Sequence, residues 1–170
     1  MRTAVNGPTH HSLVLVDGCG PLPGDPFGPR DAPAWLENEL SVPGLSYCEA
    51  RSAYCNANTR RRVMHVDGTY FVMADHLTSE SPHTYRWQLR GRGKVGGEQE
   101  TLGVCLTDFE NQLCEWQYKN IGLRAHVLAA GGPGIFSTYE AVYEKTSDQS
   151  YPQDALAVDA PAAANMAFLP

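Results

Sequence analysis

Residues 60–91 read RRRVMHVDGTYFVMADHLTSESPHTYRWQLRG, and this stretch decides the fold class. Within residues 61–75, two runs of apolar and aromatic side chains are separated by the pair Asp67-Gly68. An Asp-Gly pair between two such runs is the strongest short-range signal for a β-hairpin. The sequence therefore predicts a hairpin over these residues that turns at Asp67-Gly68.

The strand expected next, residues 83–90, alternates strictly in side-chain type. Successive side chains of a strand point to opposite faces of the sheet. One face then carries His83, Tyr85, Trp87 and Leu89, and the other carries Thr84, Arg86, Gln88 and Arg90. We expect the first face to pack against the core and the second to meet water.

Outside this stretch the predicted elements are also short. LVLV at 13–16 indicates a buried strand before a turn at Asp17-Gly18, and the Gly/Pro-rich residues 18–33 indicate a long surface loop. Further predictions are a brief helical turn at Trp35–Leu40, a strand at 45–55, a hairpin turn at GRGKVGG (91–97), and strands at 101–107, 113–118, 123–129 and 137–144. Short strands between turns predict an all-β fold, an antiparallel β-sandwich with hardly any helix.

The length of 170 residues allows one domain, spanning 1–170. The net charge of −6 argues against nucleic acid as a partner, because phosphates demand a basic surface. No stretch has the apolar length of a membrane span, so no membrane partner is expected. The basic run Arg60-Arg61-Arg62 has two interpretations. It is either a solvated strand end or a contact for an acidic sugar polymer, whose carboxylate or sulfate groups would accept paired hydrogen bonds from the arginines.

The five cysteines form no CxxC pair and no zinc-finger spacing. We expect buried, reduced thiols by default. A disulfide between Cys105 and Cys114 is the alternative, and the sequence does not decide the redox state of the other cysteines. No pattern of a catalytic nucleophile, a paired acid or a phosphate-binding loop is present, so no catalytic residue is predicted.

Thr9-His10-His11-Ser12 is the densest polar site in the sequence, and it lies immediately before the first apolar strand. Two neighbouring histidines at a strand start place at least one imidazole at the rim of the sheet, where a metal or substrate can reach it. The alternative reading is a pair of solvent-facing histidines without a role. No nearby carboxylate completes a set of metal ligands, so this segment supplies one ligand at most.

Both chain ends favour a piece of a larger protein. The first apolar strand begins within a few residues of Met1, and the chain ends on the apolar run NMAFLP, whereas termini are usually polar and frayed. The opening residues lack the pattern of a secretory signal, which in a fragment would lie upstream.

The sequence resembles the second domain of the heparinase II/III-like polysaccharide lyases. HHSLVLVDG is similar to that family's HNT-like opening, and residues 60–91 share its basic start, its strand ending in Asp and its His-x-Tyr-x-aromatic strand. GPGIFSTYEAVYE and the closing AFLP are similar to its late strands. The resemblance implies a β-sandwich preceded by an N-terminal α/α toroid domain, in a periplasmic or secreted protein that cleaves acidic polysaccharides by β-elimination.

The resemblance also implies that most catalytic residues lie upstream of this chain, which alone is expected to be inactive. Several members hold zinc in the sandwich, and the HNT-like histidine is one ligand. His11 matches that histidine by its distance to Asp17, and His10 matches it by the residue types that follow, so the register stays open. The other ligands are absent here, and Arg90 stands where many members have His. Zinc is therefore expected in the intact parent and not in this chain alone.

Two hypotheses follow for the function. The first is a β-sandwich domain of a polysaccharide lyase that lacks most of the catalytic residues. The second is a non-catalytic carbohydrate-binding or structural β-sandwich. The sequence does not identify the polysaccharide or the oligomeric state.

Overall fold

The computed structural model describes residues 8–21, 34–130, 134–146 and 149–170. These residues form antiparallel strands and one short 3-10 turn, η1 (Pro8–His10). The all-β antiparallel prediction is confirmed for the described residues. None of the helices in this part of the chain is long and apolar enough to cross a membrane.

The strands form two sheets. In chain order they are β1 (Val14–Val16), β2 (Ala34–Val42), β3 (Leu45–Tyr54), β4 (Ala57–Val66), β5 (Tyr70–Arg90), β6 (Val104–Asp108), β7 (Leu113–Tyr118), β8 (Ile121–His126), β9 (Leu128–Ala130), β10 (Ile135–Thr146) and β11 (Gln149–Leu169). The eight-stranded sheet has the order β10-β11-β5-β4-β3-β2, with β1 added to β5 and β9 added to β11. The second sheet has three strands, β6-β7-β8.

The large sheet folds back on itself because its two longest strands bend. β5 and β11 have 21 residues each, and they carry Pro82 and Pro161. Proline has no N–H to give to a sheet, so it interrupts the ladder. The pairing of β5 with β11 shifts register between Ala160 and Ala163, next to Pro161. The sequence pattern predicted separate strands before and after residues 76–82, and the structure joins them into one bent strand.

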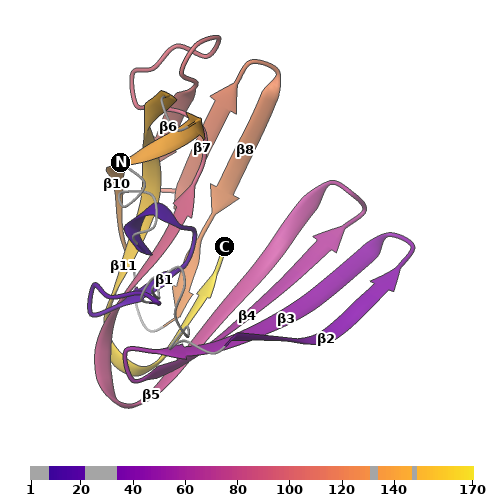
Figure 1. Cartoon of the computed structure of the whole chain (residues 1–170), viewed down its shortest axis with the longest axis vertical. Helices are drawn as coiled ribbons and strands as arrows, with labels where there is room; N and C mark the ends of the chain where they lie inside the picture. Colours follow the sequence, from indigo (N-terminus) through magenta and orange to yellow (C-terminus); the bar gives the residue numbers. More distant parts are fainter. Residues whose placement is uncertain (1–7, 22–33, 131–133, 147–148) are drawn as a thin grey trace.

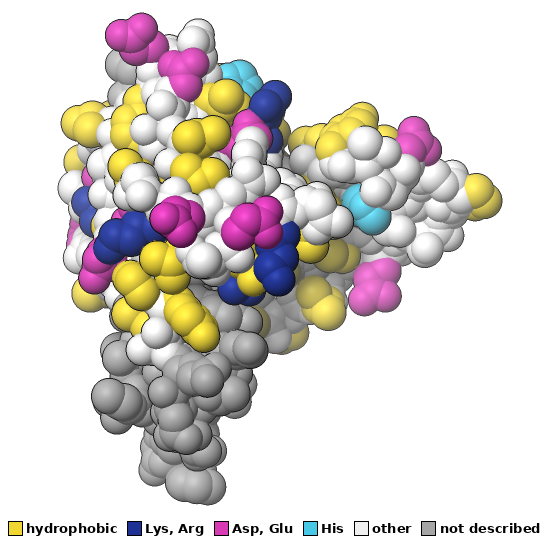
Figure 2. Space-filling view, turned by 90° about the horizontal axis from the view of Figure 1, so that it is seen from above, with side chains coloured by type: hydrophobic (Ala, Val, Ile, Leu, Met, Phe, Trp, Pro, Cys, Tyr) yellow, Lys and Arg dark blue, Asp and Glu magenta, His cyan; other side chains and the backbone are white. Residues whose placement is uncertain are grey.

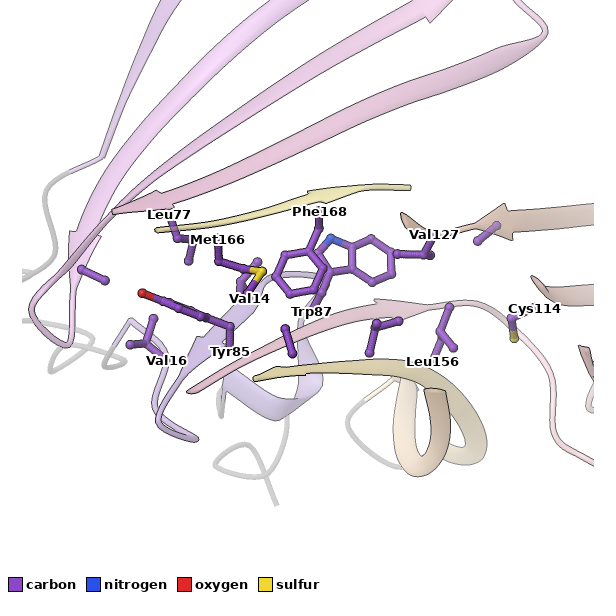
Figure 3. Packing of buried hydrophobic residues seen from close by; sticks show 14 of the residues in the cluster. Val14, Val16, Leu77, Tyr85, Trp87, Cys114, Val127, Leu156, Met166 and Phe168 are labelled. Carbon is purple, nitrogen blue, oxygen red and sulfur yellow. The ribbon is translucent and has the colours of Figure 1, made fainter. Parts of the chain in front are cut away.

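The bend produces two layers with the core between them. The first layer contains the first part of β5 and the last part of β11, and the second contains β1 and the other parts of the two long strands. Figure 3 shows Leu77, Met166 and Phe168 reaching in from the first layer, toward Tyr85 and Trp87 of the second. Each of these five side chains is almost fully buried. Tyr85 and Trp87 lie on the face that the alternation of residues 83–90 assigned to the core.

The three-stranded sheet closes one end of this core with Trp116, Cys114 and Cys105, which are all buried. Trp116 donates its Nε1–H to the carbonyl oxygen of Asp154 at 2.7 Å. The Sγ atoms of Cys105 and Cys114 lie 3.7 Å apart as free thiols in contact, and the described cysteines form no disulfide. The hydrogen bond from Cys114 lowers the pKa of the Cys105 thiol.

β2, β3, β4 and the first part of β5 form an arm that stands away from the rest of the molecule (Figure 1). In Figure 2 the arm projects to the right, and positive and negative side chains are mixed over the visible face of the body. The predicted hairpin is the β4–β5 pair, and its turn has positive φ at Asp67 (49°) and Gly68 (65°). This is the backbone that an Asp-Gly turn favours.

The predicted strand at 13–16 is confirmed as β1, which ends in a tight turn at Asp17-Gly18. Val16 and Cys19 exchange both backbone hydrogen bonds across this turn, at 2.8 Å each. Most of the predicted surface loop, residues 22–33, lies outside the described residues.

The predicted helical turn at Trp35–Leu40 is wrong, because these residues belong to β2. The apolar spacing of Trp35, Leu36 and Leu40 fits a helical turn, but it also fits a strand with a bulge. Pairing with β3 shifts register between Glu37 and Leu40, and Asn38 has a φ of 53°. The backbone hydrogen bonds to β3 select the strand over the helical turn, and these bonds cannot be predicted from the sequence pattern of β2 alone.

The predicted hairpin turn at GRGKVGG is also wrong. β5 and β6 belong to different sheets, so these residues cross between sheets. The crossing is tight: the N–H of Asp154 donates to the carbonyl oxygen of Gly93 at 2.8 Å, and a Cβ on Gly93 would lie 2.4 Å from the carbonyl oxygen of Val104. Gly91, Gly93 and Gly97 are therefore required here by close packing.

Candidate functional site

The segment that contains His10 and His11 is attached to the second layer by hydrogen bonds to its backbone. Nε2 of Gln88, on β5, donates to the carbonyl oxygens of Pro8 at 2.6 Å and His11 at 2.7 Å. Tyr139, on β10, donates its hydroxyl to the carbonyl oxygen of Thr9 at 2.9 Å and contacts Gln88 Oε1 at 3.0 Å. The carbonyls of this segment are therefore fixed from two neighbouring strands.

Ser12 fixes the end of the segment next to β1. Its carbonyl oxygen accepts a hydrogen bond from Nη1 of Arg61 at 2.8 Å, and its Oγ accepts one from the backbone N–H of Arg90 at 3.1 Å. Residues 8–12 are thus bound to β4, β5 and β10, which gives the two histidines a defined backbone position.

The side chain of His11 is exposed at this position, and that of His10 lies outside the described residues. Exposure at the start of β1 fits the prediction that an imidazole stands at the rim of the sheet. Among the described residues there is no group of three or more His, Cys, Asp or Glu side chains that could hold a metal ion. The described residues alone do not make a zinc site, and which histidine corresponds to the family's ligand stays a prediction.

Gln88 was missed by the sequence pattern, which placed it on the face that meets water. It is 1% exposed, because residues 8–12 and Tyr139 cover it. Arg86, the preceding side chain on that face of β5, is exposed and paired with Asp159. Gln88 is the one amide on a face that otherwise carries charged and hydroxyl side chains, and this is the only signal of its burial. Moving a neutral amide out of water costs less free energy than moving a charged group.

Replacing Gln88 with leucine is expected to lower the free energy of unfolding by about 1–3 kcal/mol, since buried carbonyls lose their donor. Amide hydrogen exchange in a peptide covering residues 9–13 should accelerate. The matched control is Gln99→Leu, because Gln99 also donates Nε2 to a carbonyl oxygen, that of Lys119, but is exposed. The control should change stability by less than about 0.5 kcal/mol. Equal exchange of residues 9–13 in both variants would contradict the role of Gln88.

Asp75 connects the two layers and the histidine segment. It is 5% exposed, and its two carboxylate oxygens accept hydrogen bonds from Nε and Nη2 of Arg61 at 2.7 and 2.8 Å. Oδ2 also accepts a hydrogen bond from Nε1 of Trp87 at 2.8 Å. Burial alone would lower the pKa of Arg61, but the bonds to Asp75 hold it above its usual value. This arrangement leaves Asp75 engaged on both oxygens, which fits a structural role.

A second polar pair fixes the turn after β1. Nδ1 of His83 lies 2.6 Å from Oδ2 of Asp17, and Thr84 donates its backbone N–H and its hydroxyl to Oδ1 at 2.9 and 3.0 Å. The hydrogen bond with His83 is the largest contribution to lowering the pKa of Asp17 below its usual value. His83 lies on the face of residues 83–90 that was expected to pack, and its ring is held there by this hydrogen bond.

The run Arg60-Arg61-Arg62 is divided by the alternation of β4. Arg61 faces the core, where it meets Asp75, whereas Arg60 and Arg62 lie on the opposite, outer face of the arm. His76 also lies on the outer face, since it is the partner of Arg60. His76 lies within β5.

A nearly buried glutamate organises the outer face of the arm. Glu49 is 4% exposed, and its carboxylate lies 3.1 Å from Nε of Arg60 and 2.9 Å from Nε of Arg62. Tyr47 donates its hydroxyl to the same carboxylate at 3.1 Å. Burial alone would raise the pKa of Glu49, but these partners lower it. The arginines are therefore held in place on the surface by an ionised carboxylate beneath them.

No protein-family model and no curated protein matches this sequence. Solved structures match its fold. Heparinase III matches with a TM-score of 0.76 at 12% identity, over 99% of this chain and 24% of that chain. A heparan sulfate lyase from Pedobacter heparinus matches with a TM-score of 0.67 at 13% identity, over 94% of this chain and 23% of that chain. This chain spans about a quarter of the length of these structures, and the likeness establishes a heparinase III-like β-sandwich fold.

Proposed function

We propose that this chain is a β-sandwich domain of a polysaccharide lyase that acts on acidic, uronic-acid-containing polysaccharides. The observation that carries the proposal is the match of almost the whole chain, 99%, to a part of heparinase III. The resemblance of residues 60–91 and of the HHSLVLVDG segment to the same family is a second support, drawn from sequence alone.

In this proposal the chain binds and orients the polymer, and other parts of a longer protein supply most of the chemistry. β-Elimination needs a base that removes the proton beside the uronate carboxylate, while the carboxylate is neutralised and the leaving oxygen receives a proton. Tyr139 and His83 are engaged in the fold, and the side chains of His11 and His126 are exposed. We therefore assign no base among the described side chains.

The fixed segment of residues 8–12 is the proposed contribution of the chain to a shared site. His10 or His11 would stand at its rim, and in an intact parent either histidine would join upstream ligands to hold zinc. The parent is proposed to be periplasmic or secreted and to carry an N-terminal α/α toroid domain as the partner of this sandwich.

The purified chain is expected to bind heparin, heparan sulfate, chondroitin sulfate or alginate and to release no unsaturated product from any of them. Binding is measured by isothermal titration calorimetry, and cleavage by the ultraviolet absorbance of the new carbon–carbon double bond. Boiled protein is the control for both. A protein-dependent rise in absorbance would show that the chain contains a base after all. Absence of binding to every acidic polymer would contradict the proposed function itself.

A further inference from the structure

The outer face of the arm carries four side chains in one line across its four strands. Trp35 on β2 is the Cα partner of Arg51 on β3, Arg51 is the partner of Arg60 on β4, and Arg60 is the partner of His76 on β5. Side chains that are directly opposite in antiparallel strands share one face of the sheet. These four residues are called the Trp35 row below.

The Trp35 row is open to solvent. Trp35 is 54% exposed, the side chains of Arg51 and Arg60 are 43% and 34% exposed, and His76 is exposed. Large apolar side chains are usually buried, and an exposed tryptophan beside two arginines is typical of surfaces that bind ligands. Trp35 lies on β2, the edge strand of the arm (Figure 1).

A hollow lies along this row. Its volume is about 390 Å³, and the four residues of the row line it. Two residues further along three of these strands, on the same face, the side chains are smaller: Ala53, Asn58 and Thr78, which also line the hollow. The step from large to small side chains forms the depression, with an aromatic ring at one end and an imidazole at the other.

The arginines of the row are oriented before any ligand arrives. Nε of Arg51 lies 2.7 Å from Glu37, and Nε of Arg60 lies 3.1 Å from Glu49. These ion pairs engage the Nε edge, and a guanidinium has five N–H donors in a planar fork that suits carboxylate and sulfate groups. With Arg62 next to them, three arginines lie around Glu37 and Glu49, so these five side chains together carry one net positive charge.

We propose that the Trp35 row binds an acidic polysaccharide, with the indole against the face of a sugar ring and the two guanidinium groups on carboxylate or sulfate groups. Neighbouring strands are about 4.8 Å apart, so four strands span roughly 14 Å. The row therefore contacts several sugar units of a chain. The proposal rests on the proposed function and deepens it by assigning the residues that hold the polymer.

The first experiment uses the exposure of Trp35. The chain has three tryptophans, and Trp87 and Trp116 are 0% and 1% exposed. Quenching of tryptophan fluorescence by acrylamide therefore reports mainly on Trp35. A heparin-derived hexasaccharide should reduce this quenching in the wild-type chain. In Trp35→Phe the remaining emission comes from the two buried tryptophans, so the hexasaccharide should no longer change the quenching. Unchanged quenching at saturating hexasaccharide would overturn the proposal.

The second experiment measures hexasaccharide affinity by calorimetry in matched variants. Arg60→Gln should weaken binding about 10-fold or more, as a charged hydrogen bond is lost, and Trp35→Ala about fivefold. Arg86→Gln is the control for Arg60, because Arg86 is also an exposed arginine in an ion pair, with Asp159, but lies in the second layer. Leu36→Ala is the control for Trp35, because Leu36 is the next residue of β2 and points to the opposite face.

Both controls should stay within about twofold of the wild-type affinity. Equal weakening by Arg60→Gln and Arg86→Gln would mean that total charge attracts the polymer, and would overturn the row as a site. Tight binding that neither Trp35→Ala nor Arg60→Gln changes would overturn the row and leave the proposed function standing. Failure of the wild-type chain to bind any acidic polymer would overturn both. Circular dichroism of each variant checks that the fold is kept.

Discussion

Replacing Asp75 with alanine is expected to lower the free energy of unfolding by about 3–5 kcal/mol, a large share of the stability of a domain of this size. The substitution removes both oxygens that pair with Arg61 and leaves its partly buried guanidinium without a carboxylate partner. It also removes the acceptor of Trp87 Nε1–H, which is buried. Urea denaturation followed by far-ultraviolet circular dichroism measures the change.

Asp159→Ala is the matched control for this prediction. Asp159 accepts hydrogen bonds from Nε and Nη2 of Arg86 at 2.7 and 2.8 Å, the same distances as in the buried pair. Its partner and its own side chain are 44% and 35% exposed, so water replaces the lost contact and the expected loss is below about 1 kcal/mol. Similar losses in the two variants would contradict the argument that burial makes the Asp75 pair indispensable.

Replacing Gly91 with alanine is expected to lower the free energy of unfolding by about 3 kcal/mol, at the upper end of overpacking effects. The new Cβ would lie 2.1 Å from Cδ2 of the Trp116 ring. Trp116 is 1% exposed and is held by its hydrogen bond to Asp154, so the ring has little freedom to move away. Thermal unfolding and the near-ultraviolet circular dichroism of the tryptophans measure the outcome.

Gly96→Ala separates steric conflict from the general cost of adding a side chain to a glycine of this loop. Gly96 has a φ of 73°, and a Cβ there meets no atom within 4 Å. Its replacement should therefore cost only about 1 kcal/mol, from backbone strain. A greater loss in Gly96→Ala than in Gly91→Ala would show that backbone conformation, and not contact with Trp116, governs this loop.

Sequence pattern predicted the parts of the fold that depend on neighbouring residues. The Asp67-Gly68 turn and the buried face of Tyr85 and Trp87 are confirmed because turn chemistry and alternation are local properties. The bend of β5 was not predicted. Pro82 alone is equally compatible with a loop, and only pairing with β11, which comes about 80 residues later, keeps both sides of the bend in one strand.

The candidate sites divide in the same way. Two histidines ahead of a strand could be recognised from sequence, and the structure adds that Gln88 fixes their backbone from far along the chain. The basic run suggested a contact for an acidic polymer, but the sequence did not show that Arg61 turns inward. The line of Trp35, Arg51, Arg60 and His76 depends on the register of three strand pairs, and no residue pattern contains that register.

The sharing of β5 and β11 by both layers determines the order in which the chain acquires structure during synthesis. The hairpins of the arm connect neighbouring segments, so they are complete once Ser79, the last β5 residue that pairs with β4, has left the ribosome. The last part of β5 can pair with β1 once Arg90 has followed, but its other edge waits for residues 155–160. Until the rest of β11 emerges, Tyr85 and Trp87 also lack the cover of Met166 and Phe168 beside an open strand edge, and this interval is when the nascent chain is most exposed to aggregation.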